Sequence, residues 1–167
     1  MILIALGSNL PSKAGTPEQT LRACLRALSH NGVTPLVVSR GHKTPAWPDP
    51  SDPPFINAVA AVSTALEPAA LMARLAATED AFGRQRAARN APRTLDLDLI
   101  DYDGRIAEGS PMLPHPRVES RGFVLIPLAE VAPAWRHPVS GLRVDVLIAG
   151  LSGAERDRVV PLASLWP

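Results

Sequence analysis

The sequence predicts an α+β fold of the ferredoxin-like type, in which helices pack on one face of an antiparallel sheet. Apolar runs typical of strands alternate with segments of helical periodicity, in the order strand, helix, strand, strand, helix, strand. Proline and glycine residues mark the ends of these segments. The length of 167 residues suits one domain, residues 1–167, with a substantial core.

The first strand and helix are indicated by the N-terminal residues. The apolar run 1–6 predicts a buried strand, which ends at the turn Gly7-Ser8-Asn9. This turn lacks the lysine and the spacing of a phosphate-binding loop, so we assign it no phosphate role. Thr16 and Gln19 form a capping box, and helical spacing of apolar residues follows. Residues 33–44 then predict a second strand.

The second half of the predicted order begins with a loop. Residues 44–54 contain so many prolines that neither a helix nor a strand ladder fits. Residues 55–62 predict the third strand and residues 68–83 the second helix. Glu79 falls on the apolar stripe of this helix, where it either reaches the edge of the stripe or forms hydrogen bonds near a site. Residues 95–100 predict the fourth strand.

The remaining chain predicts smaller elements. Residues 102–105 have the composition of a hairpin turn, and residues 113–117 form a proline-constrained loop. Residues 121–131 indicate a proline-interrupted helical or mixed segment. We expect a small helix within residues 142–151 and an edge strand over residues 159–162.

The fourth predicted strand carries two acidic residues. Successive side chains of a strand point to opposite faces, so Leu95, Leu97 and Leu99 share one face. Asp96 and Asp98 share the other, with their Cα atoms about 7 Å apart. Two carboxylates at this spacing can serve one metal cluster. The alternative is the acidic outer face of a half-buried strand.

Four arginines, Arg84, Arg86, Arg89 and Arg93, precede this strand. Guanidinium groups bind phosphates through paired donors, and carboxylates bind hard cations such as Mg²⁺. The arginines and the acid pair together therefore indicate a site for a magnesium-bound polyphosphate. A solvated basic loop is the alternative.

Composition narrows the class of protein. The net charge of +1 gives no overall field that would attract nucleic acid or an anionic membrane, and we expect neither as a partner. The single Cys24 permits no internal disulfide and suits a reducing compartment. The apolar run 1–6 is too short for a signal peptide or a membrane span. We therefore expect a cytoplasmic protein.

Several motifs together resemble the 6-hydroxymethyl-7,8-dihydropterin pyrophosphokinases of folate biosynthesis. The resemblance extends from Leu6 to about residue 133. The motifs that carry it are Thr44-Pro45, Phe55-Ile56-Asn57, the string from Arg93 to Asp98, His115 and Arg121-Gly122-Phe123.

The resemblance implies an activity and a set of site residues. The expected enzyme is a monomer with a single pyrophosphokinase domain. It moves pyrophosphate from MgATP to the hydroxymethyl group of the pterin and releases AMP. Two Mg²⁺ ions would be bound by Asp96 and Asp98. The implied catalytic residues are Arg84, Arg86, Arg93, Asp96 and Asp98. The implied pterin-binding residues are Thr44, Pro45, Trp47, Phe55, Asn57 and Phe123. The implied ATP-binding residues are Arg84, Arg86, Arg89, Arg93, His115 and Arg121.

Three other functions suit the same fold. An RNA-recognition module would need aromatic residues on its central strands, and the aromatic content is only 4%. A small-molecule regulatory module would give no reason for the Asp96 and Asp98 pair. A two-metal nucleotidyl transferase or cyclase could use the same carboxylates but would release pyrophosphate rather than AMP.

Overall fold

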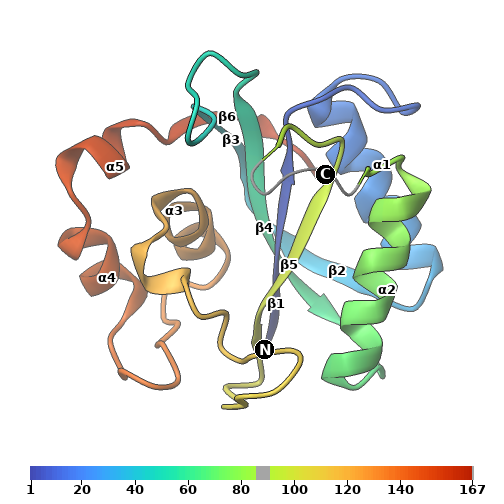
Figure 1. Cartoon of the computed structure of the whole chain (residues 1–167). Coiled ribbons are helices and arrows are strands. Elements are labelled where there is room, and N and C mark those ends of the chain that lie inside the picture. The colour runs from blue at the N-terminus through green and yellow to red at the C-terminus, as the bar shows by residue number, and fades with distance from the viewer. Residues whose placement is uncertain (86–90, 167) are drawn as a thin grey trace.

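The computed structural model describes residues 1–85 and 91–166. Within these residues, six strands form one antiparallel sheet with helices on both of its faces (Figure 1). The strands are β1 (Ile2–Ser8), β2 (Thr34–Val38), β3 (Arg40–Thr44), β4 (Phe55–Ser63), β5 (Asp96–Tyr102) and β6 (Val160–Ser164). The helices are α1 (Pro17–His30), α2 (Pro68–Ala81), α3 (Gly122–Val131), α4 (Val144–Gly150) and α5 (Gly153–Asp157), with a 3₁₀ turn at Val118–Ser120. None of these helices combines the length and the apolarity that crossing a membrane requires.

The fold class, α+β with an antiparallel sheet, is confirmed, and the predicted order of elements holds except within residues 33–44. The sheet order is β5-β1-β4-β3-β6, and β2 pairs with the far end of β4. Helix α1 begins with the predicted capping box: the Thr16 side chain accepts from the Gln19 N–H, and the Gln19 side chain accepts from the Thr16 N–H. The structure adds α5 and the 3₁₀ turn, which the sequence did not predict.

Residues 33–44 form two strands, so the prediction of one strand was wrong. The break is at Ser39, whose N–H donates to the Val59 carbonyl at 2.9 Å. The Ser39 hydroxyl oxygen accepts from the Val59 N–H at 3.0 Å. A side-chain oxygen thus takes the place of a backbone carbonyl. Strands β2 and β3 then pair with opposite ends of β4.

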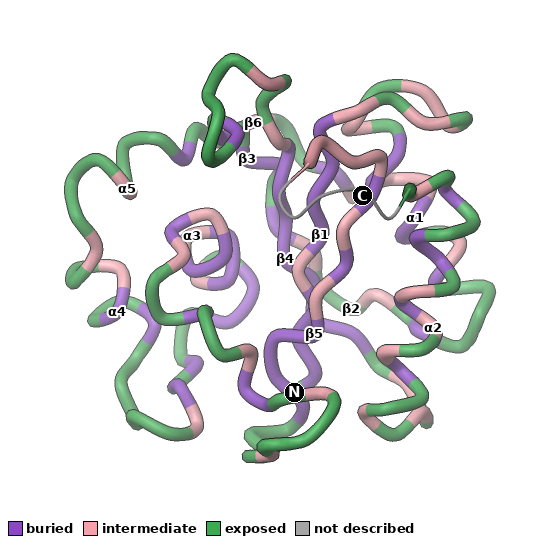
Figure 2. Tube along the Cα trace, viewed as in Figure 1, coloured by how far each residue is buried: buried purple, intermediate pink, exposed green. Residues whose placement is uncertain are grey.

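Helices cover both faces of the sheet, whereas the sequence predicted helices on one face. Helices α1 and α2 pack on one face, where Leu21 and Leu75 contact apolar residues of β1, β4 and β5. Helix α3 packs on the other face, where Leu125 and Leu128 lie in a second core with Val59 of β4. The central strands are accordingly buried, while many connecting segments are exposed (Figure 2). The α3 face of the sheet carries the candidate site.

Candidate active site

The two aspartates of β5 share the face of the strand opposite the leucines, as the alternation predicted, and this face is the one that α3 covers. Leu95, Leu97 and Leu99 are buried in the core beneath α1 and α2. Asp96 and Asp98 instead line a pocket on the opposite face. Its lining consists of Ala5, Leu6, Gly7, Asn57, Ala58, Asp96, Asp98 and Phe123. Residues of three strands and of α3 therefore form a single site.

Two predicted arginines meet at Asp96. Its Oδ1 atom lies 2.7 Å from Nη1 of Arg84 and 3.2 Å from Nη1 of Arg93. All three side chains are partly buried, so solvent screens these ion pairs less than it would at an open surface. This side of the pocket thus has guanidinium groups directly beside a candidate metal ligand.

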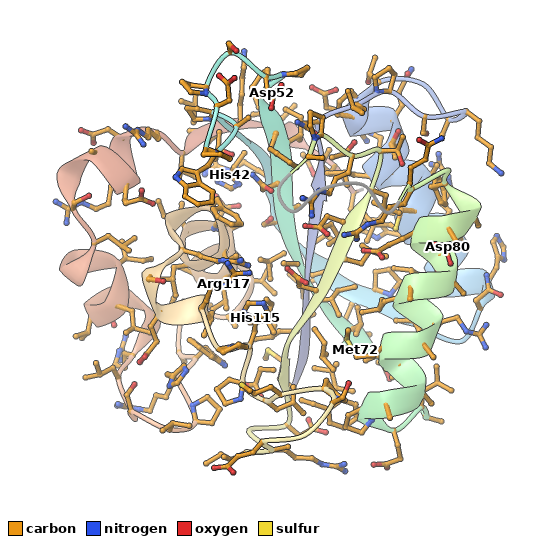
Figure 3. All side chains as sticks on the ribbon, viewed as in Figure 1. His42, Asp52, Met72, Asp80, His115 and Arg117 are labelled. Carbon is orange, nitrogen blue, oxygen red and sulfur yellow. The ribbon has the colours of Figure 1, made fainter. Side chains whose placement is uncertain are left out.

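Asp98 has a different pair of neighbours, an arginine and a histidine. Its Oδ2 atom lies 3.6 Å from Nη1 of Arg121 and 3.9 Å from Nε2 of His115. Burial, and after it the charge of Asp96, raise the pKa of Asp98 although His115 and Arg121 oppose the shift. Burial likewise lowers the pKa of His115. His115 and Arg117 lie between α3 and β5, on the opposite side of the strand from Asp80 of α2 (Figure 3).

The acid pair fits magnesium. Mg²⁺ prefers oxygen ligands and is commonly held by one or two carboxylates together with substrate phosphates and water. Burial disfavours the ionised form of Asp98 and raises its pKa, and a cation bound between the two carboxylates would offset that cost. No cluster of three or more acidic, His or Cys side chains suited to a metal occurs in the described part of the chain. Further ligands would therefore come from phosphate and water.

Asn57 occupies the neighbouring part of the pocket on β4. It is 7% exposed, and its Nδ2 atom donates to the Thr44 hydroxyl at 2.8 Å. At the start of α3, the Arg121 guanidinium lies 5.4 Å from the centre of the Phe123 ring. Four of the six predicted pterin residues, Thr44, Phe55, Asn57 and Phe123, thus lie in or next to the pocket.

Gly7 forms the floor beneath these side chains. A Cβ atom at this position would lie 3.0 Å from Oδ1 of Asn57, 3.7 Å from the Phe55 ring and 3.8 Å from Cβ of Asp96. The sequence assigned Gly7 only to a turn. The structure places it at the end of β1, where the lack of a side chain lets the candidate pterin and metal residues approach one another.

Glu79 of α2 is a site residue that the sequence left undecided. Its side chain is buried rather than extended to the edge of the helix stripe. One carboxylate oxygen, Oε1, accepts from the Leu97 N–H at 2.6 Å and from Nη1 of Arg84. Burial raises the pKa of Glu79 to about 7, against the opposing effects of the Leu97 N–H and Arg84. The only sequence signal for this role was an acidic residue on an apolar stripe.

Two other predicted pterin residues lie outside this group. Pro45 and Trp47 are exposed on the proline-rich segment, and Trp47 is 69% exposed. Arg86 and Arg89 lie outside the described residues. Their predicted roles remain predictions.

Comparison with known proteins identifies the family. The 7,8-dihydro-6-hydroxymethylpterin-pyrophosphokinase family matches residues 3–133. The 2-amino-4-hydroxy-6-hydroxymethyldihydropteridine pyrophosphokinase of Methylorubrum extorquens is 38% identical over 160 residues, which are 92% of this chain and 96% of that protein. The protein of the same name from Haemophilus influenzae is 38% identical over 146 residues, which are 86% of this chain and 89% of that protein. A Synechocystis protein, again of this name, is 45% identical over 119 residues, which are 71% of this chain but 56% of that longer protein. The chain therefore belongs to the 7,8-dihydro-6-hydroxymethylpterin-pyrophosphokinase family.

Proposed function

We propose that this pocket binds MgATP and the pterin side by side and aligns them for pyrophosphoryl transfer. As a member of its family, the chain is a pyrophosphokinase of folate biosynthesis that uses ATP as the donor. One observation carries the residue-level proposal. Asp96 and Asp98 line the same pocket as Asn57 and Phe123. A metal-bound triphosphate and a flat, amide-like ring would therefore be adjacent.

On the nucleotide side, Asp96 and Asp98 would hold two Mg²⁺ ions, which supply positive charge to the triphosphate oxygens. Arg84 and Arg93 now share Asp96, and ATP would offer them phosphate oxygens instead. His115 and Arg121 would contact the nucleotide phosphates from the α3 side. The nucleotide-binding roles of Arg86 and Arg89 rest on the family resemblance alone.

On the pterin side, Phe55 and Phe123 would stack on the two faces of the ring. Asn57, held by its hydrogen bond to Thr44, would present its remaining amide groups to the hydrogen-bonding edge of the pterin. Backbone groups of residues 44–47, including Pro45 and Trp47, would complete that edge.

The chemical step needs alignment more than a covalent intermediate. The hydroxymethyl oxygen forms a bond to the β-phosphorus, and the bond between that phosphorus and the oxygen bridging to the α-phosphate breaks. AMP leaves with the bridging oxygen, and the hydroxyl proton passes to water. Holding both substrates in line can contribute about 7 kcal/mol or more. The arginines stabilise charge that shifts among the phosphate oxygens during transfer.

The direct test is AMP release from MgATP with and without 6-hydroxymethyl-7,8-dihydropterin. We expect stoichiometric AMP and pterin pyrophosphate only when both substrates and Mg²⁺ are present. Release of pyrophosphate without AMP would instead favour a nucleotidyl transferase or cyclase.

We also propose that the enzyme acts as a monomer in the cytoplasm. The monomeric state is what the family resemblance implies. The single Cys24 is a buried free thiol, and a chain without a second cysteine for a disulfide suits a reducing compartment. Light scattering at micromolar concentration tests the monomer, and a dimer mass would contradict it.

A further inference from the structure

The Asn9 side chain joins two segments that are far apart in sequence. Asn9 follows β1 and is 3% exposed. Its Nδ2 atom donates to the Pro53 carbonyl at 2.9 Å, and its Oδ1 atom accepts from the Arg93 N–H at 2.7 Å. One buried amide therefore holds the end of the proline-rich segment and the residue that begins the approach to β5.

Each of these segments leads directly to a different substrate site. Pro53 is followed by Pro54 and then Phe55, and the ring of Pro54 fixes its φ angle, so the position of the Pro53 carbonyl constrains Phe55. Arg93 pairs with Asp96 at 3.2 Å. The Asn9 amide thus stands between a proposed pterin residue and a proposed nucleotide residue.

We propose that Asn9 is a positioning residue that couples pterin binding to nucleotide binding. A buried amide is stable when both its N–H and its carbonyl groups have partners, and losing either partner is costly. Displacement of either segment would leave one group of Asn9 unpaired. A ligand that fixes one segment in place therefore favours the placement of the other, and by linkage the effect is reciprocal. This inference rests on the proposed function.

The experiment measures a coupling ratio by isothermal titration calorimetry. The ratio is the Kd of 6-hydroxymethylpterin for the free protein divided by its Kd in saturating Mg²⁺ and α,β-methylene-ATP, an analogue that cannot transfer pyrophosphate. We expect a ratio of about five or more for the unaltered protein. Measuring the Kd of the nucleotide with and without pterin should give the same ratio.

The variants Asn9→Ala and Asn9→Asp separate this role from folding. Asn9→Ala loses both side-chain bonds but keeps the backbone bonds from residues 9 and 10 to the Arg93 carbonyl, at 3.1 and 3.2 Å. Asn9→Asp keeps the acceptor for the Arg93 N–H and loses the donor to Pro53. If Asn9→Ala does not fold, Asn9→Asp alone is used to measure the coupling ratio. We expect the ratio to fall towards one in both, with smaller changes in the affinity for each ligand alone.

Ser8→Ala is the matched control. The hydroxyl of Ser8, the residue before Asn9, donates to the Thr94 carbonyl at 2.6 Å, so Ser8→Ala removes a neighbouring side-chain bond and leaves both bonds of the Asn9 amide in place. We expect Ser8→Ala to keep the ratio. A ratio near one in the unaltered protein would overturn the inference. So would an undiminished ratio in both Asn9 variants, or equal loss in Ser8→Ala.

The proposed function fails in a different way. If the unaltered protein binds neither ligand, or if Phe123→Ala and Arg121→Ala change neither affinity, the substrate assignments themselves are wrong. If both ligands bind, those two variants weaken binding and the Asn9 variants keep the ratio, only the coupling role is refuted.

Discussion

Glu79 accepts a 2.6 Å hydrogen bond from the backbone N–H of Leu97, the residue between Asp96 and Asp98. Strand β5 is at the edge of the sheet, so this outward N–H has no partner strand. The same carboxylate oxygen contacts Arg84. A single side chain of α2 therefore fixes both the strand that carries the acid pair and an arginine that pairs with Asp96.

Removing this acceptor should destabilise the protein. In Glu79→Ala, the Leu97 N–H is left unpaired in a buried position, and we expect a loss of about 1–3 kcal/mol in the free energy of unfolding. Glu79→Gln keeps an oxygen acceptor and should lose less. Urea denaturation measures both. Glu67→Ala, which removes an exposed partner of Arg105, is the control and should change stability little. Equal losses in Glu79→Ala and Glu79→Gln would contradict the account.

Glu79 should also contribute to the pH dependence of stability. Burial raises its folded pKa from an ordinary 4.5 to about 7, so the folded state holds this proton more tightly than the unfolded chain does. The associated stability is fully present below pH 4.5 and is lost as the pH rises through about 7. Between these values, Glu79→Gln should show a flatter stability profile than the unaltered protein. If the stability of Glu79→Gln and that of the unaltered protein change with pH in parallel, Glu79 does not contribute to the pH dependence.

Asp98→Asn should separate stability from activity. The raised pKa of Asp98 means that its ionised form is disfavoured in the metal-free protein. A neutral isostere should therefore stabilise that state at neutral pH, by up to about 1 kcal/mol. It should also lower kcat by about a hundredfold or more, because a charged ligand for Mg²⁺ is lost. Thermal unfolding without metal and AMP release with it are the two measurements. Retention of near-normal activity at ordinary Mg²⁺ concentration would refute the metal role.

Asn57→Ala should weaken pterin binding by about 1–3 kcal/mol, because the pterin edge loses a buried partner. The affinity for MgATP should barely change. Thr44→Val removes only the hydroxyl that accepts from Asn57, so its effect should be in the same direction but smaller. Isothermal titration calorimetry with the pterin and with MgATP measures the two affinities of each variant. Equal weakening of both ligands in Asn57→Ala would indicate a folding defect rather than a pterin contact.

The two arginines on Asp96 should differ kinetically. Arg93 is tied to the β5 approach by its backbone bonds to Asn9, and we expect Arg93→Ala to raise the KM for ATP about tenfold. Arg84 is held by Glu79 as well as Asp96, and we expect Arg84→Ala to lower kcat about a hundredfold with little change in KM. Steady-state kinetics distinguishes the two patterns. Matching changes in both variants would show that the arginines act as one binding group.

Local rules of sequence predicted much of this arrangement. The alternation of Leu97 with Asp96 and Asp98 placed the acid pair correctly, because a strand with one buried face admits only one register. The capping box at Thr16 likewise located α1. Both depend on residues close together in the chain.

Features that depend on distant partners were not predictable in this way. The break at Ser39 requires Val59 as a partner. Burial of Glu79 depends on the Leu97 N–H, which points away from β1 and donates to the Glu79 carboxylate. The packing of α3 on the second face depends on which face α1 and α2 leave open. None of these relations has a periodic signal.

The glycine floor of the pocket has a consequence for inhibitor design. A side chain at Gly7 would crowd the amide of Asn57, a group proposed to bind the pterin. Resistance to a compound that lies directly over Gly7 would therefore be difficult to acquire by substitution of this glycine. A substitution that displaced the compound would also disturb the residues on which the natural substrate depends.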